Sequence, residues 1–413
     1  MRVRGWFREG PLANRNYVLF LCGAFISAMG SWMHMVAQGW TVLQLSNSAF
    51  VLGLLGFAQL APVLLFGVLG GSLADRVDRR RFLIKTQMVS AALAVLLATL
   101  QFMGRTTIPI LLTIAAANGV MNALNSPAWM SFIKELVGPE QLRQAIAINS
   151  ARFNLSRIVG PAIGGWLLVS FGAAACFAVY AASFIAIQGA LFLIDERRPN
   201  AATSLGPRPR GVLVVARNPQ VRAVLIPALG LTILAMPYSN FLPAMARDVF
   251  LAGPQGLSIL LTCTGIGAIL GAILSGFPLI SRRPRRALAV QQVIAGGALA
   301  AFAWSPHFWL GAVCIVAFGA ALIGFMTTAN ATIQLAAEPG TEGRALGLWT
   351  VVNSGMVPLG SLGMGALAQA LGVRGAIGIG GLGCLVCGIA AVVVAQRAGG
   401  VFAVVRRPES ITG

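Results

Sequence analysis

Long apolar runs alternate with short polar gaps over almost the whole chain. A run of about 20 apolar residues is enough for one α-helix to cross the hydrocarbon core of a bilayer. The pattern predicts an all-α membrane protein, because a helix satisfies its backbone hydrogen bonds inside lipid. We expect twelve transmembrane helices, at residues 17–43, 49–73, 82–103, 108–133, 141–170, 174–194, 222–246, 255–280, 287–305, 309–335, 343–371 and 374–396.

The longest polar interruption divides these runs into two sets of six. It covers residues 195–221 and is rich in Pro, Gly and Arg, so it is expected to be a cytoplasmic linker. The domains predicted on either side are six-helix bundles at 17–194 and 222–396, with cytoplasmic tails at 1–16 and 397–413.

The two halves share a sequence motif. The stretch from Gly160 to Gly165 recurs from Gly360 to Gly365, at an offset of 200 residues. A motif repeated at the same place in each half predicts two pseudo-symmetric bundles, with a cavity on the interface between them.

Composition agrees with a bilayer as the solvent. Only 10% of the 413 residues are charged and 57% are hydrophobic, whereas a soluble domain carries about 25% charged residues. The net charge of +19 does not indicate nucleic-acid binding, because the basic residues lie in the gaps between apolar runs. With the N-terminus in the cytoplasm, 25 of the 30 Lys and Arg residues face the cytoplasm and three face outward. Both termini are therefore predicted to be cytoplasmic, in a multi-pass protein of a bacterial inner membrane.

The apolar runs lack the residue sets that enzymes and metal sites need. None of the eleven Asp and Glu residues falls in the middle of a run, and no Ser/His/Asp set or His/Glu cluster occurs there. Cys384 and Cys387 have the spacing of a redox or metal pair. They lie inside an apolar helix without a nearby His or a second pair, which favours core packing. We expect no catalytic residues, no metal and no cofactor.

A basic loop lies between the second and third runs, where residues 70–82 read GGSLADRVDRRRF. This loop resembles the signature loop of the major facilitator superfamily, although Asp78 stands where a glycine is usual. The resemblance implies a cytoplasmic gate that packs on the other bundle and stabilises the outward-open state; the alternative is a solvated loop needed only for topology. The matching residues are Gly71, Leu73, Ala74, Asp75, Arg76, Arg79 and Arg80.

A second motif lies in the fifth run, at Gly160, Pro161, Gly164 and Gly165. Small residues let helices approach closely and Pro bends the span. The motif resembles the fifth-span motif of the superfamily's drug antiporters, where it is associated with export. The first run, around His34, resembles that of the secretion-type branch, which includes the enterobactin exporter.

Two arginines of the fifth run are unusual inside a membrane span. Arg157 lies fourteen residues beyond Arg143, about 21 Å deeper into the bilayer at 1.5 Å per residue. It is interpreted either as a cavity residue that attracts anionic groups or gates access, or as a structural cation facing polar walls. Arg152 is expected to be a structural partner of Asp75 or of helix ends.

Polar side chains in other runs are candidates for the cavity wall. Asn118, Asn122, Asn125 and Trp129 share one helical face, either to line the cavity or to bond between helices. His34 and Gln38 lie one turn apart, and His34 is either a proton carrier or a hydrogen-bonded wall residue. The second half offers Tyr238, Asn240, Asn330 and Asn353.

These features together predict a secondary transporter of the major facilitator superfamily. We expect a monomer that exports a small organic molecule, drug-like or siderophore-like, by rocking two bundles about a central cavity, with protons as the candidate coupling ion. The alternatives are import of a metabolite and, in a different class, a membrane receptor or scaffold that transports nothing.

Overall fold

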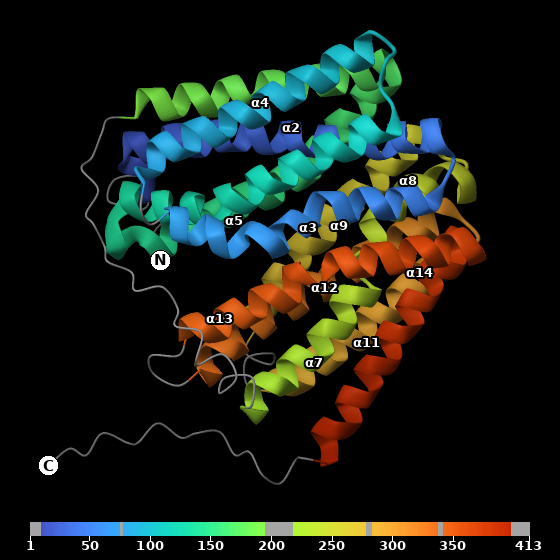
Figure 1. Cartoon of the computed structure of the whole chain (residues 1–413). Helices are drawn as coiled ribbons and strands as arrows, with labels where there is room; N and C mark the ends of the chain where they lie inside the picture. Colours follow the sequence, from blue (N-terminus) through green and yellow to red (C-terminus); the bar gives the residue numbers. More distant parts are fainter. Residues whose placement is uncertain (1–9, 75–76, 195–217, 278–282, 338–341, 398–413) are drawn as a thin grey trace, which may run out of the picture.

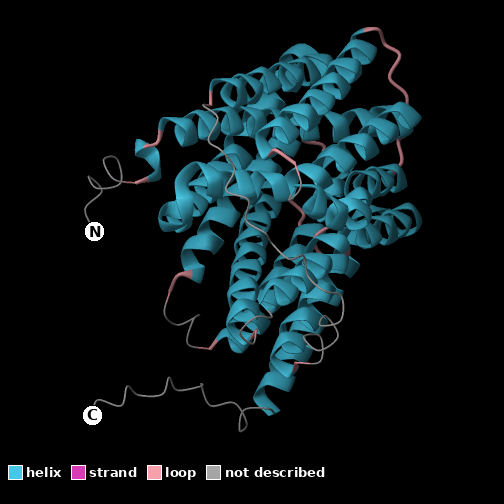
Figure 2. Ribbon diagram, turned by 60° about the vertical axis from the view of Figure 1, so that its left-hand side comes forward, coloured by secondary structure: helices cyan, strands magenta, loops and turns pink. Residues whose placement is uncertain are grey.

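The computed structural model describes residues 10–74, 77–194, 218–277, 283–337 and 342–397. Most of the predicted linker and tails, together with Asp75 and Arg76, lie outside the described residues. Within the described residues the regular structure is helical and no strand occurs (Figure 2).

The first half of the molecule, as we use the term, comprises residues 10–194. Polar side chains begin its helices: Asn14 accepts from the backbone N–H of Asn16 at 3.0 Å, and Asp78 accepts from that of Arg81 at 2.9 Å. Such caps satisfy N–H groups that have no partner inside the helix. The helices are η1 (Pro11–Ala13), α2 (Arg15–Ser46), α3 (Ala49–Ala74), α4 (Arg79–Phe102) and α5 (Ile108–Leu193).

The second half comprises residues 218–397. The single span predicted at 222–246 is interrupted at residues 235–237, where Pro237 lacks the N–H that would continue the ladder. The elements are α7 (Pro219–Leu234), α8 (Tyr238–Ala244), η3 (Met245–Val249), α9 (Gly253–Ser275), α11 (Pro284–Ala303), α12 (Phe308–Ala336), α13 (Glu342–Thr350), η4 (Val351–Gly355) and α14 (Val357–Arg397).

Helix α5 is interrupted twice, because Gly138 and Gly172 have φ angles of 74° and 80°. Gly372 interrupts α14 in the same way, with a φ of 75°. Glycine adopts this backbone region without a steric penalty. The chain folds back at Gly172, since the thiol of Cys176 lies 3.5 Å from the carbonyl oxygen of Gly164. The three breaks fall in the gaps that separate the predicted runs.

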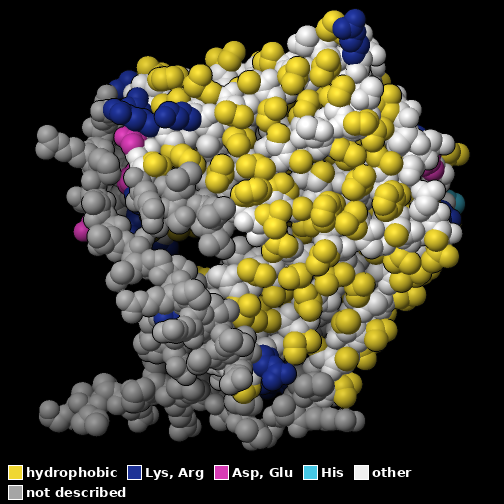
Figure 3. All heavy atoms as spheres, viewed as in Figure 1, with side chains coloured by type: hydrophobic (Ala, Val, Ile, Leu, Met, Phe, Trp, Pro, Cys, Tyr) yellow, Lys and Arg dark blue, Asp and Glu magenta, His cyan; other side chains and the backbone are white. Residues whose placement is uncertain are grey.

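Nine helical segments of the described residues are long and apolar enough to cross a membrane. Hydrophobic side chains spread over the face seen in Figure 3, and Lys and Arg lie toward its edges. Side chains as apolar as Ile185 and Leu65 are 74% and 68% exposed, which lipid tolerates and water does not. The chain is a multi-pass membrane protein.

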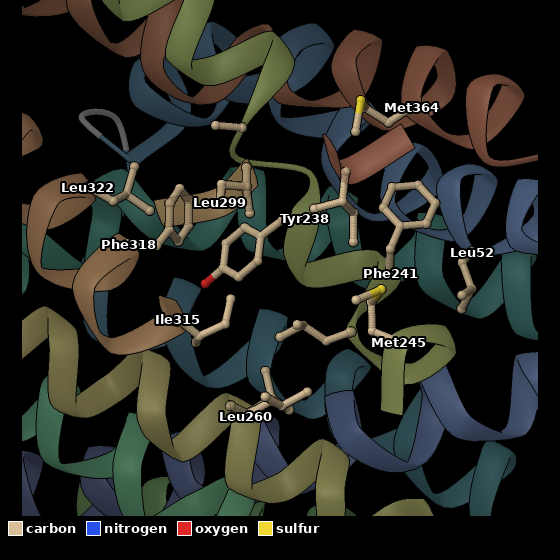
Figure 4. Close-up of a cluster of buried hydrophobic side chains, with 14 of the residues drawn as sticks. Leu52, Tyr238, Phe241, Met245, Leu260, Leu299, Ile315, Phe318, Leu322 and Met364 are labelled. Atoms are coloured by element: carbon tan, nitrogen blue, oxygen red, sulfur yellow. The ribbon is translucent and has the colours of Figure 1, made fainter. Parts of the chain in front are cut away.

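The helices of the two halves converge at one end of the molecule and diverge toward the other (Figure 1). We call the first the far end, where α2 finishes at Ser46, and the second the terminal end, where α2 begins. One hydrophobic cluster crosses from half to half, since Trp40 and Leu52 belong to it together with Phe241 and Met245 (Figure 4). The halves therefore share a core.

Candidate functional site

Two glycines of the repeated motif bring the halves into contact. A Cβ atom built on Gly165 in α5 would overlap the side chain of Ser258 in α9. A Cβ atom on Gly365 in α14 would lie 3.2 Å from the Cα atom of Gly53 in α3. Backbones can approach this closely only where a side chain is absent. The same position of each motif thus forms a contact with the opposite half.

The rest of the motif packs inside its own half. A Cβ atom on Gly160 would lie 2.6 Å from Cβ of Trp32, and one on Gly164 would lie 2.9 Å from the Cα atom of Met33. Pro161 is buried between them. The motif therefore presents one face to α2 and another to α9.

Arg157 lies one turn before this motif, at the junction of the halves. Its guanidinium carbon lies 5.8 Å from the ring centre of Trp32, within the range of a cation–π interaction. Its charge also lies close to the hydroxyl of Tyr238 in the second half. That hydroxyl lies 3.3 Å from Oγ1 of Thr264 in α9, and Figure 4 shows the Tyr238 ring beside Phe318 and Ile315.

Amide side chains lie close to the same junction. Gln59 donates to Gln38 at 2.8 Å, and Gln38 is only 1% exposed. Asn240 donates to Oγ of Ser361 at 3.0 Å and lies against Gly56 of the opposite half. Asn240 thus lies where the two halves meet, and Gln59 is a partner of Gln38 that the sequence did not single out.

The four candidate residues between positions 118 and 129, predicted to share one helical face, lie in different environments. Thr86 of α4 donates to Oδ1 of Asn125 at 2.6 Å, and the Trp129 ring packs 4.6 Å from that of Phe20. Asn122 is exposed and Asn118 is half-buried. Asn125 and Trp129 thus contact neighbouring helices of their own half.

His34 lies among aromatic rings of the first half. Its ring stacks on Tyr180 at 4.5 Å with an interplanar angle of 24°, and lies 5.4 Å from Phe177. In the second half, Gln334 donates to Asn330 one turn earlier. The Nδ1 atom of His34 and Oδ1 of Asn353 are buried without a hydrogen-bond partner among the described residues. The described residues contain no group of three His, Cys, Asp or Glu side chains that could hold a metal ion.

Three more of the predicted residues, all arginines, have partners in the first half. Arg152 donates to the carbonyl of Ala24 in α2 at 2.6 Å. Arg79 forms an ion pair with Glu135, and Arg80 donates to the carbonyl of Leu191 at 2.6 Å. Gly71 lies within α3, while Asp75 and Arg76 lie outside the described residues.

Arg247, one of the three basic residues predicted to face outward, joins the halves at the far end. Arg247 in η3 donates to the carbonyl of Leu43 at 2.9 Å and to the side chain of Asn47, which caps the end of α2. Asp248 accepts from the same guanidinium with both carboxylate oxygens. The sequence could not indicate this role of Arg247, because one of its acceptors is a backbone atom 204 residues away.

Three characterised proteins are similar to this chain over most of its length. The staphyloferrin A transporter of Staphylococcus aureus is 26% identical, over 86% of this chain and 90% of its own. The multidrug efflux pump Tap of Mycolicibacterium fortuitum is 27% identical, over 93% and 96%. The enterobactin exporter EntS of Salmonella choleraesuis is 25% identical, over 88% of each chain.

Solved structures share the fold. A bacterial homolog of the human lysosomal transporter Spinster, in an inward-facing and occupied conformation, superposes with a TM-score of 0.71 at 18% identity. The match covers 93% of this chain and 97% of that one. The profile of the transmembrane secretion effector family matches residues 8–404. The chain therefore belongs to the transmembrane secretion effectors of the major facilitator superfamily, which are transporters and not enzymes.

Proposed function

We propose that this protein is a secondary transporter that exports a small organic molecule from the cytoplasm by alternating access, in exchange for protons. An efflux pump and a siderophore exporter are among its relatives, which supports the export direction. The fifth-span motif at the junction of the halves supports it as well.

The observation that most supports this proposal is that the halves are in contact at one end of the molecule and diverge toward the other (Figure 1). They touch at the far end through the glycine contacts and Arg247. Toward the terminal end, polar side chains on apolar helices become exposed, namely Asn122, Ser126, Thr327, Gln334 and Thr350. Such groups avoid lipid, so they indicate a water-filled cavity. A junction that is closed at one end and open to water at the other is one state of an alternating-access cycle.

The helix breaks support the proposal of two six-helix bundles. With turns at Gly138 and Gly172, α5 crosses the membrane three times, and with a turn at Gly372 the segment 344–393 crosses twice. The nine apolar segments then make twelve crossings, six in 17–194 and six in 222–396, joined by the linker 195–221. The paired contacts of Gly165 and Gly365 support the pseudo-symmetry.

Arg157 is proposed as the cation that attracts substrate. It lies between an indole and a phenol, with polar groups from both halves nearby. An anionic group that binds Arg157 would compete for its interaction with Tyr238 and thereby couple binding to movement of the halves. Such a site favours substrates that carry a carboxylate or an ionised catechol beside an aromatic or apolar body.

The charge bias supports a cytoplasmic position for both termini, and the bacterial relatives support a bacterial inner membrane. The terminal end then faces the cytoplasm, and the described state is open to the side from which an exporter loads. One chain contains the whole junction, so the transporting unit is proposed to be a monomer.

The test is transport into inside-out vesicles with an imposed pH gradient, acidic inside. Enterobactin, staphyloferrin A and ethidium, each labelled or fluorescent, are the probes. Uptake that an uncoupler abolishes supports proton-driven export. Uptake only into right-side-out vesicles would instead show import, and no flux of any probe in either orientation would favour a receptor or scaffold.

A further inference from the structure

An apolar groove lies on the flank of the first half, away from the junction. It is formed by α4 and the last part of α5 and has a volume of about 610 Å³. These two segments run side by side along the top of the view in Figure 1. Its lining includes Met88, Ala91, Val95, Ala182, Ile185 and Gly189.

The groove opens to the membrane rather than to the protein interior. Met88 and Val95 on one wall are 56% and 54% exposed, and Ile185 on the other is 74% exposed. In a membrane-spanning region such a surface faces lipid. Its walls have the character of an acyl-chain site.

Hydrogen bonds join the two walls of the groove at the terminal end. Arg80 donates from Nε to the carbonyl of Leu191 at 2.6 Å and from Nη2 to that of Phe192 at 3.1 Å. One turn deeper, Nε2 of Gln188 donates to the carbonyl of Ile84 at 3.0 Å. Gln188 and Phe192 also line the groove, so its shape is held by hydrogen bonds and not only by apolar packing.

Two basic residues lie on the same face of α4 as the groove residues, nearer the terminal end. Arg81, Lys85, Met88 and Val95 are spaced by four, three and seven residues, which aligns them along one stripe of α4. Arg81 and Lys85 are both exposed at the terminal end. Figure 3 shows Lys and Arg side chains gathered at the upper left, near the start of α4. An apolar groove that leads to two exposed cations has the charge pattern of a phospholipid with an anionic headgroup.

We propose that this groove is a specific binding site for an anionic phospholipid. One acyl chain lies along Met88, Val95 and Ile185, and the phosphate is held by Lys85 and Arg81. A basic cluster beside transmembrane helices attracts anionic headgroups at the membrane surface. The site is independent of substrate transport, since none of its residues lies at the junction of the halves.

Gly189 allows a direct test, because a Cβ atom built on it would meet no atom within 4 Å. A leucine at this position fills the groove without displacing the backbone. Gly297 in α11 is the matched control, since it also has open space around its Cβ position and lies outside the groove. Ala182→Leu fills the groove from a second, exposed position and serves if Gly189→Leu fails to fold.

The measurement is native mass spectrometry of the full chain in detergent, titrated with dioleoyl phosphatidylglycerol or dioleoyl phosphatidylcholine. We expect phosphatidylglycerol to bind about tenfold more tightly than phosphatidylcholine, given two cations near the headgroup. Gly189→Leu should weaken binding of both lipids, while Gly297→Leu behaves like the wild type. Lys85→Gln with Arg81→Gln should remove the preference for phosphatidylglycerol, and the exposed pair Arg222→Gln with Arg286→Gln should keep it. Wild-type binding by Gly189→Leu and Ala182→Leu, or equal binding of the two lipids to the wild type, would overturn the proposal.

Discussion

Gly165 of α5 lies against Ser258 of α9, so closely that a Cβ atom at position 165 would overlap the serine hydroxyl. It would overlap the Cβ atom of Ser258 as well, and the nearest atom outside that side chain, the carbonyl oxygen of Pro254, is 3.4 Å away, an ordinary contact distance. The clash is therefore confined to one side chain. This relationship makes the contact between the halves testable by a compensating pair of substitutions.

Gly165→Ala is predicted to impair transport, and Ser258→Gly is predicted to restore it in the double variant. Overpacking of this kind costs about 1–3 kcal/mol, which corresponds to about a 5- to 150-fold change in the balance between the two states. The initial rate of probe uptake into vesicles, normalised to protein amount, is the measurement.

Gly363→Ala is the control for this pair, since its Cβ atom would lie in open space. It should transport like the wild type. If the double variant is no better than Gly165→Ala alone, the close contact with Ser258 is not what limits the cycle.

Arg157→Ala is predicted to abolish transport of enterobactin at normal expression. The substitution removes the central cation together with its interactions with Trp32 and Tyr238. Tyr238→Phe removes the hydroxyl near Arg157 together with its hydrogen bond to Thr264. It should reduce the rate about fivefold, because one hydrogen bond contributes about 1 kcal/mol. Uptake at several probe concentrations separates a loss of affinity from a loss of turnover.

Arg105→Ala provides the comparison for Arg157, since Arg105 is an exposed cation in the connection between α4 and α5. It should leave transport unchanged. Full transport by Arg157→Ala would remove this arginine from the mechanism.

The helices were predictable because a run of apolar residues is a local signal, and most observed bounds differ from the predicted ones by a few residues. The glycine motif was also informative, because a residue without a side chain marks a close approach wherever it occurs. The interruption at residues 235–237 was not predicted, since Pro occurs in other helices here without ending them, as Pro62 does in α3.

The site was predictable only in part, because its partners are distant in sequence. His34 and Gln38 were singled out together, and the structure adds a partner for each: His34 stacks on Tyr180, and Gln38 accepts a hydrogen bond from Gln59. A lone amide in an apolar run indicates that a partner exists but does not identify it. For Asn125, only the three-dimensional structure shows that its partner is Thr86 of α4.

His34→Gln is predicted to leave the pH dependence of transport unchanged. The ring lies against Phe177 and Tyr180 of its own half, so a wall residue fits its position better than a proton carrier. Loss of the stacked ring should instead lower stability by about 1 kcal/mol. Uptake rates across about pH 5 to 8 test the point, with the exposed His307→Gln as the control. A flattened or shifted profile in His34→Gln alone would make His34 a proton carrier.

Arg247→Ala is predicted to favour opening of the far end. Arg247 joins the halves by bonding to the carbonyl of Leu43 and to Asn47, and a partly exposed bond of this kind contributes about 1 kcal/mol, or about a fivefold change in population. Pulsed EPR distances between spin labels at the exposed Leu45 and Leu371 report the change. Arg374→Ala is the matched control, because Arg374 bonds to the carbonyl of Ser305 within its own half. Identical distance distributions in the two variants would show that Arg247 does not hold the far end closed. A longer distance in Arg247→Ala alone would show that Arg247 stabilises the closed far end.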